Sequence, residues 1–519
     1  MPAPLANAVC GPQVPGTVKA APGTNLSTLN PCPLNACCDI WGQCGTTSDF
    51  CTPSGTGAPG TAAPGTNGCI SNCGTDIVIG FPPAEFRRIA YFESFNLDRP
   101  CLNMDISEID TSQHTHVHFA FLDLTSNFEV DITRYREQFD QLVQLKGIKR
   151  IVSWTMSTDP STYAIFRNAV SAANRQTFAS NLVAFVNQWN LDGVDIDWEY
   201  PGEQDVPGIP ADSADDGQNL ATFLVVLRSL LDFSKSISIA TPASYWYLRD
   251  FPIGVMAQSL DYIVYMTYDL HGQWDYGNAF SSVGCPTGNC LRSHVNLTET
   301  LNALSMITKA GVNTSKLVVG ITSYGRSFQM TTPGCRGPMC TYTGPLSGAA
   351  PGPCTETPGY IANAEISQII AQNGNVQTFH DSGSDSDILV YDSVQWVAYM
   401  GNTTKATRTS LYKGMNMGGV SDWAVDLEMP PTPTSPSQPS APAESGSFPD
   451  PIGANGYMNP YLRNCTPEQS KMLDEAWSEA ATLAQGHYEW WPNGKWQDAM
   501  TLYMGVNSKN DQYVFITIE

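Results

Sequence analysis

The sequence predicts an α/β fold, a closed (β/α)8 barrel, on three observations. Eight short apolar runs recur between residues 87 and 426, and segments with helical periodicity separate them. Between the third and fourth runs, an apolar stripe follows the spacing of a helix that packs on a sheet, through Phe178, Leu182, Phe185 and Trp189. Strands that alternate with such helices pair in parallel, and eight of them can close into a barrel.

The eight expected strands are located by their apolar residues. They are RRIAYF (87 to 92), HTHVHFAF (114 to 121), KRIVSW (149 to 154), DGVDIDWEY (192 to 200), SISIATPAS (236 to 244), LDYIVYMTYDL (260 to 270), KLVVGITSYG (316 to 325) and GGVSDWAVD (418 to 426). The last two are about 90 residues apart, which is too long for a plain loop. We therefore expect a small inserted α+β subdomain at about residues 329 to 400, with Cys335, Cys340 and Cys354 inside it.

Composition divides the chain, whose 519 residues exceed what one core usually organises. Residues 1 to 76 are rich in Cys, Gly and Pro and form a small disulfide-held module, and the barrel occupies residues 77 to 428. Residues 429 to 455 are a Pro/Ser-rich linker. In residues 456 to 519 a helix start at Thr466 to Gln469 predicts a short helical region.

The charge and the cysteines restrict the partners and the compartment. A net charge of −23 repels nucleic acid and anionic membranes, so an uncharged substrate is expected. Eight of the 15 cysteines lie between Cys10 and Cys73, which indicates an oxidising, extracellular compartment. Five glycosylation triplets agree with secretion, at Asn25, Asn296, Asn313, Asn402 and Asn464. The start, MPAPLANAVCGPQ, is too polar for a signal peptide, so we expect a removed leader or a fragment.

Three carboxylic acids alternate along the fourth expected strand. Asp195, Asp197 and Glu199 share one face of the strand, and apolar side chains occupy the other. Crowded carboxyls share protons, which raises at least one pKa and provides a general acid near neutral pH. Glu199 is nearest the C-terminal end, where barrel active sites are built. A cation site or a solvated acidic strand is the alternative.

These acids, together with Asp192, reproduce the Asp-x-x-Asp-x-Asp-x-Glu signature, and the chain resembles glycoside hydrolase family 18, the chitinases, over residues 86 to 428. Met266-Thr267-Tyr268-Asp269 resembles the family's sixth-strand motif, Tyr324-Gly325-Arg326 its seventh, and Trp423 the tryptophan that floors its cleft. The resemblance implies hydrolysis of β-1,4-linked N-acetylglucosamine polymers with retention. We expect a monomer that uses no cofactor.

The resemblance also implies roles for the site residues. The substrate's N-acetyl oxygen attacks the anomeric carbon while Glu199 donates the proton. Asp197, with Tyr268, orients the acetamide, Asp195 shares the proton of Asp197, and Asp192 is structural. The expected substrate-binding residues are Tyr91, Phe121, Trp198, Trp246, Met266, Asp269, Tyr324, Arg326 and Trp423. For Tyr91 and Phe121 core packing is the alternative, and Arg326 either binds substrate or only neutralises the acidic barrel.

Two features of the early strands bear on these expectations. His114, His116 and His118 alternate along one strand, and we expect a structural role rather than a metal site. The family carries Ser-x-Gly-Gly on its third strand, whereas Trp154, Thr155 and Met156 follow Ser153 here. A shortened segment would displace the acidic strand by several ångströms and weaken turnover.

The N-terminal cysteines follow the CX4CCX5CX6C spacing of hevein-type chitin-binding modules. Neighbouring cysteines cannot bridge each other, so Cys37 and Cys38 must hold different loops. The eight expected disulfide cysteines are Cys10, Cys32, Cys37, Cys38, Cys44, Cys51, Cys69 and Cys73. The ligand positions of such modules fall on Asp39, Trp41, Gln43 and Phe50, and Trp41 and Phe50 keep the aromatic character. The alternative to a chitin-binding module is a disulfide-bonded unit that is kept only for stability.

Three functions remain open at the level of sequence. The first is chitinase activity on chitin or chito-oligosaccharides. The second is a chitin-binding lectin that has lost turnover, and the third is an endo-β-N-acetylglucosaminidase acting on glycoprotein glycans. The order of module, barrel, linker and tail resembles fungal chitinases related to the killer-toxin α subunit, which implies a longer parent protein that is truncated at Glu519.

Overall fold

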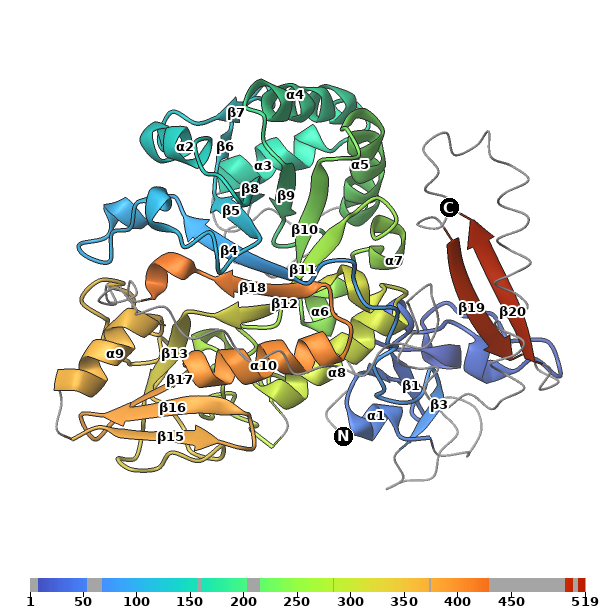
Figure 1. Cartoon of the computed structure of the whole chain (residues 1–519). Helices are drawn as coiled ribbons and strands as arrows, with labels where there is room; N and C mark the ends of the chain where they lie inside the picture. Colours follow the sequence, from blue (N-terminus) through green and yellow to red (C-terminus); the bar gives the residue numbers. More distant parts are fainter. Residues whose placement is uncertain are drawn as a thin grey trace, which may run out of the picture. The chain divides into compact units, whose positions relative to one another are not determined.

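Eight parallel strands form a closed barrel in the computed structural model, which describes residues 8–53, 68–155, 160–202, 215–282, 284–372, 375–428, 500–506 and 512–518 (Figure 1). The barrel strands are β4 (Arg87–Glu93), β5 (His116–Ala120), β8 (Lys149–Thr155), β9 (Gly193–Asp197), β10 (Ser236–Pro242), β11 (Tyr262–Met266), β12 (Leu317–Thr322) and β18 (Gly419–Trp423). Each coincides with one of the apolar runs, β4 and β8 extending one residue beyond theirs, so the predicted barrel is confirmed.

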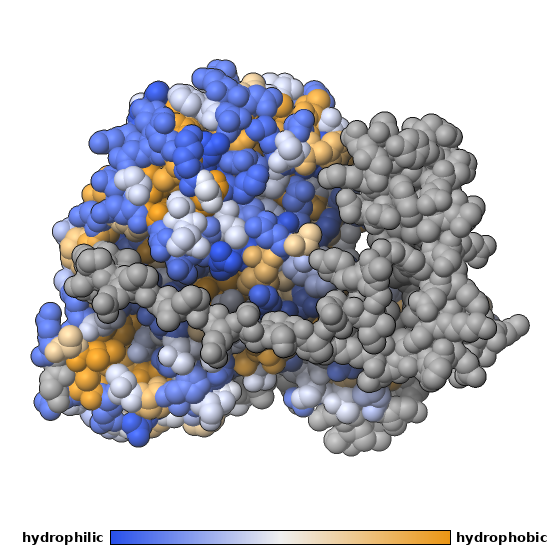
Figure 2. Space-filling view, in the orientation of Figure 1, coloured by the Kyte–Doolittle hydropathy of each residue, from blue (hydrophilic) through white to orange (hydrophobic). Residues whose placement is uncertain are grey.

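α-Helices follow the barrel strands from β5 to β12, as in a (β/α)8 fold, whereas short 3-10 helices follow β4 and β18. These α-helices are α2 (Arg136–Leu142), α3 (Pro160–Ala169), α4 (Arg175–Gln188), α5 (Asp216–Leu230), α6 (Tyr245–Leu248), α7 (Ile253–Met256), α8 (Leu297–Lys309) and α10 (Asn402–Gly414). The stripe on α4 places Phe178 and Leu182 in the core. On the face shown in Figure 2, hydrophilic residues predominate over α2, α3 and α4.

Short elements complete the described chain. A two-stranded sheet pairs β6 (Asp123–Leu124) with β7 (Val130–Asp131). The 3-10 helices are η1 (Gly11–Gln13), η2 (Leu26–Thr28), η3 (Pro33–Asn35), η4 (Asn96–Asp98), η5 (Ile106–Glu108), η6 (Gln273–Asp275), η7 (Thr314–Lys316) and η8 (Val425–Leu427). None of the helices in this described part is long and apolar enough to cross a membrane.

An inserted antiparallel sheet separates β12 from β18. Its elements are β13 (Tyr324–Gln329), β14 (Ile361–Ala362), α9 (Asn363–Gln372), β15 (Gln377–Asp381), β16 (Ser386–Tyr391) and β17 (Gln395–Tyr399), with the strand order β14-β13-β17-β16-β15. Tyr324 already belongs to this sheet, so the insertion begins earlier than the expected residue 329. Tyr324 and Arg326 therefore reach the site from the inserted sheet and not from a barrel strand.

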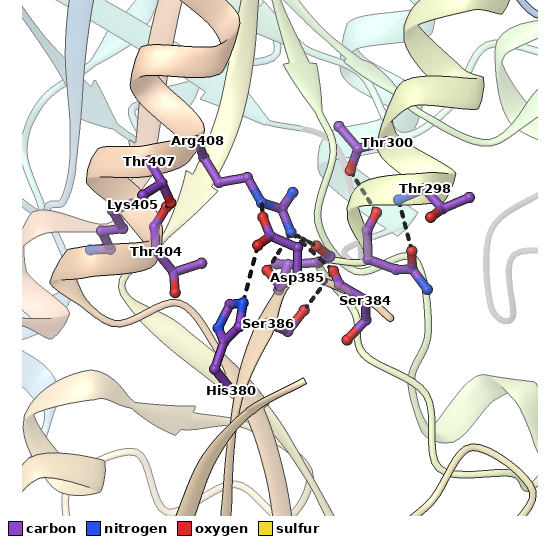
Figure 3. Close-up of polar contacts among 12 residues, drawn as sticks. Thr298, Thr300, His380, Ser384, Asp385, Ser386, Thr404, Lys405, Thr407 and Arg408 are labelled. Atoms are coloured by element: carbon purple, nitrogen blue, oxygen red, sulfur yellow. Dashed lines mark hydrogen bonds and ion pairs between the residues drawn. The ribbon is translucent and has the colours of Figure 1, made fainter. Parts of the chain in front are cut away.

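A buried arginine joins the inserted sheet to the barrel (Figure 3). Arg408 points from α10 toward the turn between β15 and β16, where its Nε donates to Asp385 Oδ2 at 2.6 Å. Its Nη2 donates to the carbonyls of Val295, Ser384 and Asp385 at 2.9, 3.1 and 2.7 Å. One guanidinium thus connects α10, the inserted sheet and the segment before α8.

The N-terminal module is a disulfide-held unit of three short strands and one helix: β1 (Cys37–Asp39), β2 (Cys44–Gly45), α1 (Ser48–Cys51) and β3 (Cys69–Ser71). Its disulfides are Cys10–Cys38, Cys32–Cys44, Cys37–Cys51 and Cys69–Cys73. Cys37 and Cys38 hold different loops, as expected. Among the described residues, the group with metal-ligand geometry is Cys10, Cys32 and Cys38, and all three are already bonded in disulfides.

The module packs on the C-terminal end of α8. Lys309 Nζ donates to the carbonyls of Asn72 and Gly74 at 2.5 and 3.1 Å, and Asn35 Nδ2 donates to the carbonyl of Lys309 at 2.8 Å. Three further disulfides brace the rest of the described chain: Cys101–Cys354, Cys285–Cys290 and Cys335–Cys340.

The C-terminal part contains an antiparallel hairpin of β19 (Met500–Val506) and β20 (Gln512–Ile518), which the sequence did not lead us to expect. The expected linker at 429 to 455 and the helix start at Thr466 to Gln469 lie outside the described residues.

Candidate active site

Asp195 lies fully buried inside the barrel among hydrogen-bond donors from three other strands. The hydroxyls of Tyr91 and Ser153 donate to Oδ2 at 2.8 Å each, and Ser238 donates to Oδ1 at 2.6 Å. His118 Nδ1 lies 3.1 Å from Oδ2. Burial alone would raise the pKa of Asp195, but His118 and the serine hydroxyls stabilise the anion and bring this pKa below its ordinary value. Asp195 is therefore an ionised carboxylate.

The third strand keeps its register beside the acidic strand. Ser153 lies opposite Asp195, and Thr155 lies opposite Asp197. Parallel pairing continues to Thr155 and the Ser153 hydroxyl reaches the Asp195 carboxylate, while the effect of the altered segment on turnover stays a prediction. His118 has a structural role, since its Nε2 lies 2.8 Å from the Tyr262 hydroxyl and its other nitrogen faces Asp195. Met156 lies outside the described residues.

Asp197 and Glu199 form a hydrogen-bonded carboxyl pair at the C-terminal end of β9. Burial, followed by the charges of Glu199 and Asp195, raises the pKa of Asp197 well above its ordinary value. Burial and the charge of Asp269 raise the pKa of Glu199 to about 7, against the opposing effect of a Tyr200 hydrogen bond. The pKa is thus raised for Asp197 and Glu199 and lowered for Asp195, and the expected sharing of a proton between Asp195 and Asp197 stays a prediction.

Asp269 connects this pair to the inserted sheet. Arg326 donates to it through Nε at 2.7 Å and Nη2 at 2.5 Å, and the Tyr324 hydroxyl donates at 2.6 Å. Burial would raise the pKa of Asp269, but the Arg326 charge lowers it far below its usual range. Arg326 thus neutralises an acid of the site. Tyr268 precedes Asp269, and burial together with the Asp197 charge holds its pKa well above its ordinary value, so its hydroxyl stays protonated.

Aromatic rings form the floor beside the carboxyls. The Trp423 ring centroid lies 5.3 Å from that of Tyr91 and 5.5 Å from that of Phe121, which it stacks on. Tyr91 is buried and serves to hold Asp195, whereas Phe121 is only half-buried. Met266 is also half-buried and packs against the cluster that contains Tyr91.

A cavity of about 520 Å³ opens next to Phe121 and Thr155. Loops that follow barrel strands line it together with the inserted segment, through Phe95, Asp98, Arg99, Pro100, Phe121, Leu122, Asp123, Arg134, Tyr135, Thr155, Thr162, Cys354, Thr355 and Glu356. It is large enough for sugar units, and its link to the carboxyl pair is Thr155, which lies opposite Asp197 on the neighbouring strand.

Comparison with known proteins places this site in a family. Residues 87–428 match the sequence model of Glycosyl hydrolases family 18. The chain belongs to this family. It is 59% identical over 439 residues to Probable chitinase LysM18 and 53% identical over 437 residues to Secreted chitinase LysM12, both of Penicillium expansum, and 37% identical over 430 residues to Killer toxin subunits alpha/beta of Kluyveromyces lactis.

Each of these alignments covers 82% of the family 18 chain described here but only 30%, 29% and 35% of the respective relative. The chain thus spans about a third of the length of these curated relatives. Among solved structures, the Ostrinia furnacalis Group IV chitinase in complex with allosamidin aligns with a TM-score of 0.56 at 24% identity, over 66% of this chain and 93% of that one. At this identity the likeness shows a shared fold.

Two tryptophans expected to bind substrate are placed differently in this family 18 barrel. The prediction that Trp198 lines the cleft is wrong, because its side chain points outward from the barrel. It is 1% exposed, and its ring packs edge-on against Phe166 of α3, with 5.2 Å between the ring centroids. Trp246 lies on α6, and the guanidinium of Arg249 covers one face of its ring at 3.7 Å. Asp192 is at the opposite end of β9 and accepts the backbone N–H of Arg150 at 3.0 Å, as a structural acid does.

Trp274 is a residue of this site that the sequence analysis missed. It follows Asp269 in the loop after β11, it is 49% exposed, and the Arg326 guanidinium lies 4.8 Å from its ring centroid. A lone tryptophan in the polar segment HGQWDYGN was the available signal, because an exposed aromatic residue in a loop that follows a barrel strand is typical of a ligand site.

The ligand positions of the N-terminal module are partly presented. Asp39 is fully buried, and its Oδ1 accepts the backbone N–H groups of Trp41 and Gln43 at 2.9 and 2.8 Å. Its side chain therefore braces the loop and does not face a ligand. Trp41 and Phe50 are half-buried, and Phe50 covers Gly45 so closely that no Cβ would fit there.

Proposed function

We propose that the chain is a chitinase that hydrolyses β-1,4-linked N-acetylglucosamine polymers with retention of configuration. The observation that carries this proposal is the buried carboxyl pair of Asp197 and Glu199 at the C-terminal end of β9, in which Glu199 has a pKa of about 7. Such a carboxyl is protonated often enough at neutral pH to act as a general acid. The chitinase names of the Penicillium expansum relatives support the same substrate.

In the first step Glu199 gives its proton to the glycosidic oxygen, and the bond from that oxygen to the anomeric carbon breaks. The acetamide oxygen of the same sugar attacks the anomeric carbon and forms an oxazolinium ring, so no protein nucleophile is required. Asp197 orients the acetamide and offsets the positive charge of the oxazolinium ring. The protonated hydroxyl of Tyr268 helps to orient the acetamide by donating a hydrogen bond to that group.

In the second step a water molecule attacks the anomeric carbon, and the Glu199 carboxylate takes the proton of that water. The oxazolinium ring opens, and the sugar leaves with its original configuration. The ionised Asp195 remains in place throughout, because its hydroxyl donors satisfy its charge. Its negative charge favours keeping the proton on the neighbouring pair.

The test of this function is product release from colloidal chitin. We expect the protein to release soluble N-acetylglucosamine oligosaccharides, measured by mass spectrometry. Binding to chitin without any release would support the lectin reading. Release of glycans from a glycoprotein, with none from chitin, would support the endo-β-N-acetylglucosaminidase reading.

The pH dependence follows from the raised pKa of Glu199. The active form carries the proton on Glu199, so kcat/KM for a soluble chito-oligosaccharide falls as pH rises through about 7 and then drops about tenfold per pH unit. Asp269→Asn removes a negative charge that raises this pKa, and we expect the alkaline limb to move to lower pH. A limb that stays in place in that variant would assign the pKa to another group.

We also propose that the protein acts outside the cell. The described residues contain seven disulfides, which persist in oxidising compartments. One relative is named a secreted chitinase. In this setting the N-terminal module is a chitin-binding module that uses Trp41 and Phe50.

A further inference from the structure

His118 is a fully buried imidazole on β5 that the proposed reaction steps do not use. It lies inside the barrel between side chains of two other strands. Its Nε2 is 2.8 Å from the Tyr262 hydroxyl of β11. Its Nδ1 is 3.1 Å from Asp195 Oδ2 of β9, although without the alignment of an ideal hydrogen bond. The two partners together decide which nitrogen of the ring carries a proton.

The Tyr262 hydroxyl and the Asp195 carboxylate favour the same tautomer of His118. Burial, followed by the Asp195 charge, raises the pKa of Tyr262 above its ordinary value, so the hydroxyl keeps its proton and can donate to Nε2. The proton of the neutral ring is then on Nδ1. The other tautomer would place the Nδ1 lone pair against a carboxylate oxygen, which is repulsive. Tyr262 thus directs an N–H group of His118 toward Asp195.

The packing around His118 holds the ring in this orientation. The ring of Tyr91 from β4 meets it edge-on with 4.7 Å between the centroids, and the Tyr91 hydroxyl donates to Asp195 at 2.8 Å. His116 is on the same face of β5, and burial together with His118 lowers its pKa to about 3, so it stays neutral. The titratable and charged groups that bear on His118 or Asp195 in the described barrel are Arg87, Tyr91, His116, Asp197, Tyr262 and Tyr268.

A buried carboxylate such as Asp195 can balance its charge in two ways. It can share a proton with Asp197, which follows it on the same face of β9, or it can stay ionised among donors. Three hydroxyls donate to Asp195, and the N–H of His118 adds a fourth polar hydrogen from β5. Polar hydrogens from four strands therefore surround the two oxygens, and the charge is satisfied without a proton from Asp197.

We propose that His118 is a positioning residue of the reaction, which keeps Asp195 ionised and in place and so leaves the proton of the site to Asp197 and Glu199. This inference rests on the proposed chitinase function and adds the residue that sets the charge of Asp195. His118 is fully buried, so it acts through Asp195 and not on the sugar.

Two substitutions separate the two contacts of His118. His118→Asn places an amide close to the position of Nδ1 and keeps an N–H for Asp195, whereas His118→Gln places it close to Nε2 and keeps a partner only for Tyr262. Without the N–H the pKa of Asp195 rises, so less of it is ionised at a given pH. We expect the acid limb of kcat/KM for a soluble chito-oligosaccharide to move up by about 1 pH unit in His118→Gln and by less than about 0.3 in His118→Asn, with KM within about twofold in both.

The matched control is His116→Gln, which removes a buried imidazole from the same face of β5 but not one beside Asp195. It should lower stability and leave the acid limb in place. An acid limb that does not move in His118→Gln means that Asp195 is balanced by a proton shared with Asp197, and the proposal is then wrong. Equal shifts in His118→Gln and His118→Asn, or the same shift in the control, would assign the effect to packing and also overturn it.

The tautomer of His118 can be measured in the unmodified protein, whether or not the variants fold. Nitrogen-15 NMR of histidine-labelled protein, with the His118 signal assigned from its contact with the Tyr91 ring, should show the proton on Nδ1. A proton on Nε2 would overturn the proposal. If the wild type does not cleave chito-oligosaccharides, the proposed function fails separately, and the tautomer then decides whether His118 pairs with Asp195.

Discussion

Glu199→Gln is expected to lower kcat on chitin by about 10²- to 10⁴-fold and to leave the affinity for chitin within about twofold. Glutamine has nearly the shape of glutamic acid and keeps a hydrogen-bonding partner for Asp197, but its amide cannot give a proton to the glycosidic oxygen. The measurement is the release of soluble oligosaccharides beside a chitin-binding assay on the same preparation.

The control for this variant is Glu137→Gln, the same chemical change at an exposed position of α2 that does not line the cavity. It should keep wild-type turnover. Activity of Glu199→Gln close to wild type would place the general acid elsewhere. A wild type with no more turnover than Glu199→Gln would leave a chitin-binding protein without catalysis.

Arg408→Ala is expected to lower the free energy of unfolding of the barrel by about 3 to 5 kcal/mol. The substitution leaves the Asp385 carboxylate without its cation and removes the donor to the carbonyls of Val295 and Ser384. Because these groups lie on three segments, their loss also loosens the inserted sheet from the barrel (Figure 3). Denaturant unfolding followed by tryptophan fluorescence measures the change.

The matched control is Arg136→Ala, which breaks an exposed ion pair with Asp140 on α2 and should have no measurable effect. A double-mutant cycle with Asp385→Ala isolates the pair. Two results would contradict the anchoring role of Arg408. One is a coupling free energy between Arg408 and Asp385 close to zero, and the other is a loss of unfolding free energy no larger than that of Arg136→Ala.

The barrel and the alternation of its acids could be predicted from local patterns. Each strand reads as one apolar run, and the spacing of two residues places Asp195, Asp197 and Glu199 on one face whatever surrounds them. Trp198 was assigned to the cleft because it is next to Glu199 in sequence. The same alternation of side chains places it on the opposite face of the strand, pointing outward. The pKa of each acid depends also on hydroxyl donors from other strands, such as Ser153 and Ser238, which the alternation within one strand does not reveal.

Register and loop placement lie beyond such patterns. Whether the residues after Ser153 displace the acidic strand depends on the pairing of two strands 42 residues apart, and the motif alone does not contain that information. Trp274 and the start of the insertion at Tyr324 depend in the same way on how loops pack around the barrel mouth.

The disulfide Cys101–Cys354 joins positions 253 residues apart and so encloses most of the barrel in one covalent ring. A protease that cuts the chain once inside this ring produces a nicked molecule and not two separable pieces. The carboxyl pair, the aromatic rings beside it and the inserted sheet would therefore stay attached to one another after such a cut. Only reduction would release the fragments.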